Sequence, residues 1–106
     1  MSRRHQVPAA QVPAAGQRVL LEPAGHGIAL FNIDGQFHAV ADSCPHQGSS
    51  LCAGQVQGRV VQCRAHGLRF DLASGYLLNS DQLKVATYPV VEEGDHLYIV
   101  IEDSAP

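Results

Sequence analysis

Alternation of apolar and polar residues is clearest near the end of the chain. In HLYIVIE (His96–Glu102), Leu97, Ile99 and Ile101 fall on one side of an extended backbone, which predicts a strand with one apolar face. Apolar runs of strand length occur at five other places. These predicted strands span residues 18–22, 28–33, 36–41, 59–63 and 84–91.

Two short polar segments between these runs predict tight turns. Asp34-Gly35 separates two apolar runs and predicts a type I′ hairpin, because Gly tolerates the positive φ of that turn. EEGD (92–95) predicts a second turn. No segment has the pattern of an amphipathic helix longer than about two turns. Short strands about ten residues apart predict an all-β fold, a small antiparallel sandwich or barrel.

The N-terminal segment contains a five-residue duplication, Gln6–Ala10 and Gln11–Ala15. It is too short to be a structural repeat, and its prolines oppose a long helix.

Composition favours a small globular protein of one domain, residues 1–106. The net charge of −3, with ten acidic and seven basic residues, argues against a nucleic-acid partner. No apolar run reaches the roughly 20 residues of a membrane span, and the N-terminus has no apolar core of a signal peptide. We therefore expect a cytoplasmic protein. Its three cysteines, an odd number, fit a metal site better than a disulfide framework.

Two similar loops carry the candidate chemistry. CPHQG contains Cys44 and His46, and CRAHG contains Cys63 and His66. Two thiolates and two imidazoles form a complete ligand set for a tetrahedral zinc ion or for a [2Fe–2S] cluster in which two His replace two Cys on one iron. The single residue between Cys44 and His46 is unusual for zinc and favours the cluster. The Gly that follows each His lets the backbone turn tightly and approach a cofactor.

The two loops resemble the C-x-H-x-G and C-x-x-H-G motifs of Rieske [2Fe–2S] proteins, and the resemblance extends over roughly 19–102. It implies the Rieske fold, with a cluster-binding subdomain of two loops at about residues 43–72. It also implies one cluster per chain, with Cys44 and Cys63 as ligands of a deeper iron. His46 and His66 would be the outer ligands.

Four non-ligand positions separate subtypes within this resemblance. Rieske proteins of respiratory complexes carry an extra Cys in each loop, joined by a disulfide, where this sequence has Ser49 and Ala65. They also place a Ser and a Tyr, which donate hydrogen bonds to the cluster, where this sequence has Leu68 and Phe70. Fewer donors make reduction harder, so we expect a potential near the bottom of the roughly −150 to +300 mV Rieske range.

The resemblance implies a one-electron carrier rather than an enzyme. The sequence is similar to the ferredoxin components of aromatic-ring-hydroxylating dioxygenase systems, which take electrons from an NAD(P)H-dependent flavin reductase and pass them to a terminal oxygenase. Both contacts would be transient and the carrier monomeric. An alternative is a small Rieske-type subunit of an assimilatory nitrite reductase. A third is a zinc module without redox chemistry.

Several residues in and around these loops are not part of the ligand pattern. Cys52 is interpreted as a small packed residue, and Arg64 and Arg69 as solvated charges or partner contacts. The covering segment LLNSDQLKV (77–85) lacks the prolines found in many relatives. The remaining histidines are expected at the surface: His5, His26, His38 and His96.

Overall fold

The computed structural model describes residues 2–42, 54–63, 67–78 and 84–102. Within these ranges the chain forms strands, with two single-turn 3₁₀ helices (η1 Ala9–Gln11, η2 Pro23–Gly25) and no α-helix. Every strand pairing is antiparallel, which confirms the predicted all-β class. The strands are β1 (Ser2–Val7), β2 (Arg18–Leu21), β3 (Ile28–Ile33), β4 (Gln36–Ala41), β5 (Gln55–Gln57), β6 (Val60–Gln62), β7 (Arg69–Asp71), β8 (Thr87–Tyr88), β9 (Val90–Glu93) and β10 (His96–Glu102).

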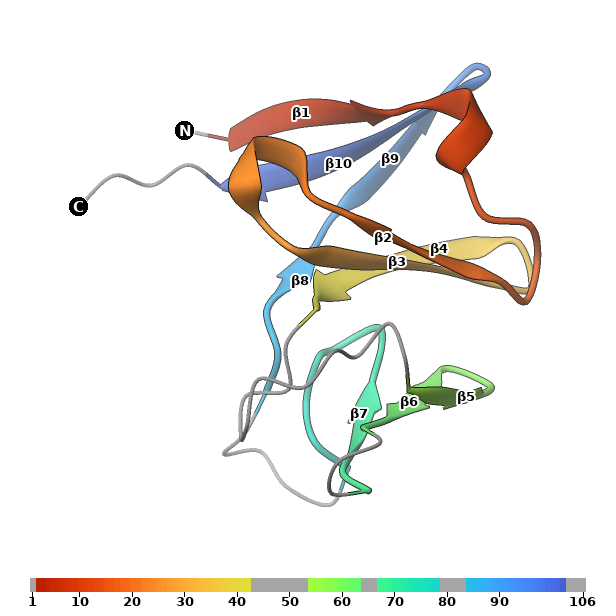
Figure 1. Ribbon diagram of the computed structural model, residues 1–106, viewed down its shortest axis with the longest axis vertical. Coiled ribbons are helices and arrows are strands. Elements are labelled where there is room, and N and C mark those ends of the chain that lie inside the picture. The colour runs from red at the N-terminus through yellow and green to blue at the C-terminus, as the bar shows by residue number, and fades with distance from the viewer. Residues whose placement is uncertain (1, 43–53, 64–66, 79–83, 103–106) are drawn as a thin grey trace.

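The strands form three sheets, in the orders β1-β10-β9, β2-β3-β4-β8 and β5-β6-β7. We call them the terminal, central and small sheets. Figure 1 shows the terminal sheet at one end of the molecule, the small sheet at the other and the central sheet between them. Candidate loop residues 63–67 follow directly from β6 of the small sheet.

Strand β3 holds the layers together because both of its faces are buried. Ile28 and Leu30 pack with Leu97, Ile99 and other residues of the terminal sheet. Ala29 and Phe31 belong to a second core. That second core is completed by Val40, Val61, Cys63, Phe70, Leu72 and Val85. A strand buried on both sides reads as a continuous apolar run, which is why IALF shows no alternation.

Two predicted features of the strands agree with the structure. Asp34 and Gly35, between β3 and β4, have φ angles of 53° and 88°, as a type I′ turn requires. Along β10, Leu97, Ile99 and Ile101 are all buried, so the alternating face is the inner face of its sheet.

The prediction of one strand over residues 84–91 was wrong. The segment contains two strands, β8 and β9, separated by Pro89. Because proline has no N–H, it cannot continue a ladder on that side. β8 pairs with β4 of the central sheet and β9 with β10 of the terminal sheet. The carbonyl of Pro89 accepts a 2.9 Å hydrogen bond from the Val100 N–H, so the crossing between sheets is anchored.

Three strands were not predicted. β1 pairs with β10 along its whole length, from Ser2 opposite Glu102 to Val7 opposite Leu97. Its residues 3–6 are mostly exposed and only Val7 is buried, so no apolar periodicity marks it. β5 and β7 have three residues each, too few for a periodic pattern to be recognised.

Candidate metal centre

The structure describes one of the four predicted ligands. Cys63 lies at the end of β6 and is completely buried in the core shared with β3 and β4. Cys44, His46 and His66 lie outside the described residues, as do Cys52, Ser49, Arg64 and Ala65.

The second loop is closed by hydrogen bonds across its base. β6 and β7 pair with Gln62 opposite Arg69. Just inside this pair, the Cys63 N–H donates to the Leu68 carbonyl at 2.7 Å, and the Gly67 N–H donates to the Cys63 carbonyl at 2.9 Å. Gly67 has a φ of 70°, a left-handed conformation that favours glycine. The Gly of the CRAHG motif is thus required by the closure of the loop.

The Gln62 side chain also supports this closure. Its Nε2 donates to the Gly67 carbonyl at 3.2 Å. A hydrogen bond from a side chain next to Cys63 to the carbonyl next to His66 fixes the spacing of the loop ends. No sequence signal distinguished Gln62 from other exposed strand glutamines.

The described ends of the first loop are tied to the central sheet. Before the loop, the Ala41 N–H donates to the Ala86 carbonyl at 2.8 Å and the Asp42 N–H to the Gly27 carbonyl at 3.0 Å. After the loop, the Arg18 guanidinium donates to the carbonyl of Gly54. The same guanidinium lies 5.8 Å from the centre of the Phe31 ring. Both loops therefore start and end on elements packed around one core.

The residues of this region fit a Rieske cluster. Cys63 is buried among apolar side chains, where a thiolate is unfavourable unless a positive group compensates its charge. A metal supplies that compensation, so a buried Cys at the loop base suits an inner ligand. Two Cys and two His complete the donor set of a mixed-ligand [2Fe–2S] cluster.

Leu68 and Phe70 offer no side-chain donor to this region. Phe70 is completely buried in the same core as Cys63, and Leu68 packs against that core while partly exposed. The expected low potential keeps this physical basis and stays a prediction.

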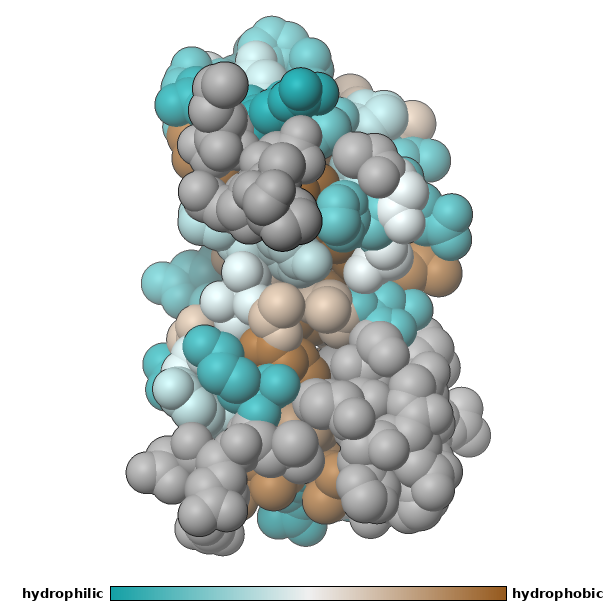
Figure 2. Space-filling model, turned by 90° about the vertical axis from the view of Figure 1, so that its left-hand side faces the viewer, coloured by the Kyte–Doolittle hydropathy of each residue, from teal (hydrophilic) through white to brown (hydrophobic). Residues whose placement is uncertain are grey.

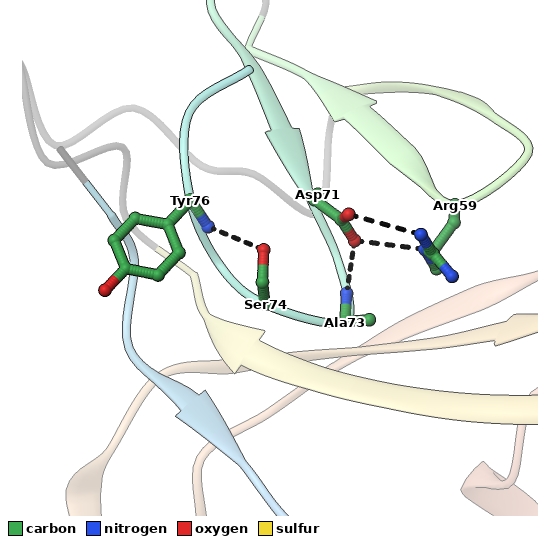
Figure 3. A network of polar contacts seen from close by, with 5 residues as sticks. All are labelled: Arg59, Asp71, Ala73, Ser74 and Tyr76. Carbon is green, nitrogen blue, oxygen red and sulfur yellow. Dashed lines mark hydrogen bonds and ion pairs between the residues drawn. The ribbon is translucent and has the colours of Figure 1, made fainter. Parts of the chain in front are cut away.

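A polar network links residues of the small sheet and of the segment that follows β7 (Figure 3). Arg59, in the β5–β6 turn, forms two contacts with the Asp71 carboxylate: Nε to Oδ1 at 3.1 Å and Nη2 to Oδ2 at 3.4 Å. Asp71 Oδ1 also accepts the Ala73 N–H at 2.8 Å, and the Ser74 hydroxyl accepts the Tyr76 N–H at 3.2 Å. These bonds shape the segment that follows β7.

His38 on β4 is partly buried, and Arg59 and Asp71 of this network are near enough to act on its charge. Burial lowers the pKa of His38 from its ordinary value of 6.5; the nearby Arg59 guanidinium lowers it further, and Asp71 opposes both. His5 is also partly buried, whereas His26 and His96 are exposed as predicted.

Comparison with known proteins identifies the family. The sequence profile of the Rieske [2Fe-2S] domain matches residues 4–89. A ferredoxin subunit of 3-phenylpropionate/cinnamic acid dioxygenase from Shigella flexneri serotype 5b is 34% identical over the full length of both chains. The chain therefore belongs to the Rieske [2Fe–2S] domain family, whose cofactor is a [2Fe–2S] cluster.

Two solved structures extend the comparison. A chain from the complex of reduced oxygenase and oxidized ferredoxin in carbazole 1,9a-dioxygenase aligns with a TM-score of 0.79 and 25% identity, over 90% of this chain and 99% of that one. A chain assigned as the NADH-dependent nitrite reductase small subunit of Mycobacterium tuberculosis aligns with a TM-score of 0.79 and 26% identity, over 98% and 99%. Both have the fold described above. Among the described residues, no helix is long and apolar enough to cross a membrane.

Proposed function

We propose that Cys44, His46, Cys63 and His66 hold one Rieske [2Fe–2S] cluster. The match of the family profile across both loops and the buried Cys63 support this assignment. When bound, the cluster supplies reversible one-electron transfer. The chain's own part is to exclude water from the inner ligand and to fix the loop ends through Gln62, Gly67 and Leu68. In this proposal the two His face the surface, where electrons enter and leave.

The protein so loaded is an electron carrier of an oxygenase system. The observation that carries this proposal is the full-length similarity to a dioxygenase ferredoxin subunit. The Rieske profile matches residues 4–89 of the chain. The carrier receives electrons from a flavin-dependent NAD(P)H reductase and gives them to a terminal oxygenase, through small, transient contacts.

We further infer that residues 1–106 form one domain, with the cluster-binding subdomain at about residues 43–72. The sharing of β3 between both cores supports this organisation. The proposed carrier is a cytoplasmic monomer, and its odd number of cysteines, three, fits a metal site better than a disulfide framework.

Spectroscopy of the purified protein tests the cluster. We expect a brown protein whose reduced form gives a rhombic EPR signal with a low average g. Its midpoint potential should lie below about +100 mV, within the range of roughly −150 to +300 mV that Rieske centres cover. Each of Cys44→Ser and Cys63→Ser removes the colour, whereas Cys52→Ser leaves it unchanged. A colourless, zinc-loaded protein, or colour that survives Cys63→Ser, contradicts the ligand assignment.

One structural likeness favours a second candidate function, a small subunit of a nitrite reductase. Gel filtration and pull-down from the native host separate the two. A monomer that shuttles electrons between a reductase and an oxygenase supports the carrier. Stable co-purification with a large sirohaem protein supports the subunit and contradicts the carrier.

A further inference from the structure

Charge is distributed very unevenly along this chain. Residues 43–70 contain three arginines and no Asp or Glu, so their formal charge is +3. The rest of the chain has four basic and ten acidic residues and carries −6. The segment that would hold the cluster is therefore the positive part of a protein whose net charge is −3.

At the small-sheet end, the structure shows which positive side chains are paired with a carboxylate and which are not. Arg59 is paired with Asp71. Arg69 is exposed on β7, and among the described residues no carboxylate pairs with it. Lys84 is exposed as well, and its Nζ lies 4.9 Å from the centre of the Tyr76 ring, a cation–π distance. Arg69 and Lys84 thus give the small-sheet end two cations without a carboxylate partner in the described chain.

Acidic residues gather at the opposite end. Glu92, Glu93 and Asp95 are exposed around the β9–β10 turn, where Glu93 pairs with Arg4. Figure 1 shows this turn at the end of the molecule remote from β5, β6 and β7. The separation gives the described part of the molecule a positive end and a negative end.

An apolar hollow of about 240 Å³ adjoins the second loop. Its lining combines backbone and side chains of Gly67, Leu68, Arg69, Leu77 and Leu78. Leu78 is 37% exposed, and its N–H donates to the Arg69 carbonyl at 2.9 Å, which holds the two residues together. Figure 2 shows apolar surface in the lower half of the molecule, beside the residues drawn in grey. The partly buried Leu68 and Leu77 and the exposed Leu78 therefore lie together around one hollow, beside an exposed arginine.

We propose that this face, formed by Leu68, Leu77 and Leu78 with Arg69 and Lys84, docks an electron-transfer partner that presents acidic side chains around an apolar contact. The proposal rests on the proposed function, since docking here brings the partner beside Gly67, the residue after His66. Charge complementarity selects an acidic partner, and the acidic residues around the β9–β10 turn at the opposite end orient the approach. The apolar hollow supplies the contact once the charges have met.

The sign of the charge at the electron-transfer edge can be measured with small oxidants of opposite charge. The reduced protein gives one electron to hexacyanoferrate(III), a trianion, or to hexaammineruthenium(III), a trication. In stopped-flow experiments we expect the second-order rate constant with the anion to fall as salt increases, and that with the cation to rise. Arg69→Gln and Lys84→Gln each lower the rate with the anion by about two- to fourfold at low salt.

Arg4→Gln is the matched control, because it removes one cation at the acidic end. It leaves the rate with the anion within the error of wild type. A rate with hexacyanoferrate(III) that rises with salt, or equal effects of Arg69→Gln and Arg4→Gln, overturns the proposal.

The apolar part needs an aromatic oxidant, and the anionic dye 2,6-dichlorophenolindophenol serves. Leu78→Ser lowers its rate constant about threefold, on the order expected for the loss of part of one buried side chain, and leaves that of hexacyanoferrate(III) unchanged. Leu20→Ser is the control, because Leu20 on β2 is also exposed, at 47%. No difference between the two serine variants refutes the apolar contact.

Two further measurements distinguish a failure of the proposed function from a failure of the docking proposal. A variant without the visible absorption of the cluster reports a failure of the proposed function and is recognised before any kinetics. Sedimentation at low salt tests a second copy of this chain as the occupant. Self-association that Arg69→Gln abolishes means that the acidic turn of another copy covers the face, and this overturns the proposal.

Discussion

Gly75 has a φ of +84° and lies against the segment that leads to β8. A Cβ at this position would lie 2.5 Å from the Val85 carbonyl oxygen and 2.9 Å from Thr87 Cγ2. The Gly75 carbonyl accepts the Val85 N–H at 2.8 Å, so the two backbones cannot separate without losing this bond. We expect Gly75→Ala to lower the free energy of unfolding by about 2–4 kcal/mol, combining left-handed strain and overpacking.

Gly16→Ala provides the control for that measurement. Gly16 has nearly the same φ, +82°, but nothing lies within 4 Å of its would-be Cβ. Its substitution carries the conformational cost alone, about 1–2 kcal/mol. Urea unfolding of both variants measures the difference, and equal losses would show that the contact with Val85 adds nothing.

Gln62 determines how firmly the second loop is held. In Gln62→Glu the donor to the Gly67 carbonyl is replaced by an acceptor of the same size, and a negative charge is added next to Cys63. The lost hydrogen bond costs about 1 kcal/mol, so we expect the cluster to be lost to a chelator up to about fivefold faster, as followed by visible absorbance. The added charge lowers the midpoint potential.

Gln57→Glu adds the same charge on β5, where Gln57 is exposed and pairs with Val60. The rate of cluster loss in this variant should equal that of wild type. If both variants lose the cluster equally fast, charge alone accounts for the effect and Gln62 has no positioning role.

At the scale of elements, the junction of β4 with β7 makes stability depend on pH. The pKa of His38 is lowered in the folded protein, so the unfolded chain binds its proton more tightly. Its contribution to stability is complete above about pH 6.5, declines as the pH falls from there, and is lost once the pH passes the lowered pKa. We expect His38→Gln to lose less stability than wild type between pH 7 and pH 5, as measured by urea unfolding.

The two charged neighbours of His38 shift its pKa in opposite directions. Asp71 raises the pKa and Arg59 lowers it, so Asp71→Asn should shift the NMR titration of the His38 ring to lower pH and Arg59→Gln to higher pH. For the stability measurement on His38→Gln, the control is His26→Gln, which removes an exposed imidazole. Shifts in the same direction in both neighbour variants would contradict this assignment.

Elements whose pattern reflects burial could be predicted from the sequence, and the others could not. β10 alternates because one of its faces is buried, and the Asp34-Gly35 turn is dictated by backbone conformation. β1 forms through backbone pairing with β10, which leaves little trace in its side chains. Pro89 divides the predicted strand 84–91 into two because proline has no N–H to donate to a neighbouring strand. The pattern of apolar residues does not reveal this break.

The sequence predicts the chemistry of the candidate site, but it does not predict the contacts that support the site. Cys63 is a predicted ligand because of its spacing to His66, and this assignment stays a prediction. Gln62 and Arg18 were not found, because a side chain that bonds to a carbonyl elsewhere in the fold has no sequence signature. Their roles depend on which backbone atoms the folded chain brings near.

For the molecule as a whole, the sharing of β3 between two cores predicts cooperative unfolding. Leu30→Ala weakens the core toward the terminal sheet and Phe31→Ala the core toward Cys63. We expect each to cost about 3–4 kcal/mol and to shift a single transition, with the visible absorbance of the cluster and the far-UV CD changing together. Cluster loss that precedes the CD change in wild type would indicate two independent units.

The pairing of β1 with β10 has a consequence for protein engineering. Ser2 lies opposite Glu102, so both ends of the described chain leave from the terminal sheet, away from the small sheet. A fusion partner at either end begins on the wrong side of a molecule 37 Å long. A linker of fewer than about 11 extended residues cannot reach past it. Short-linker fusions to a reductase should therefore transfer electrons between molecules, whereas an electrode tether attached at either end leaves the small sheet facing solution.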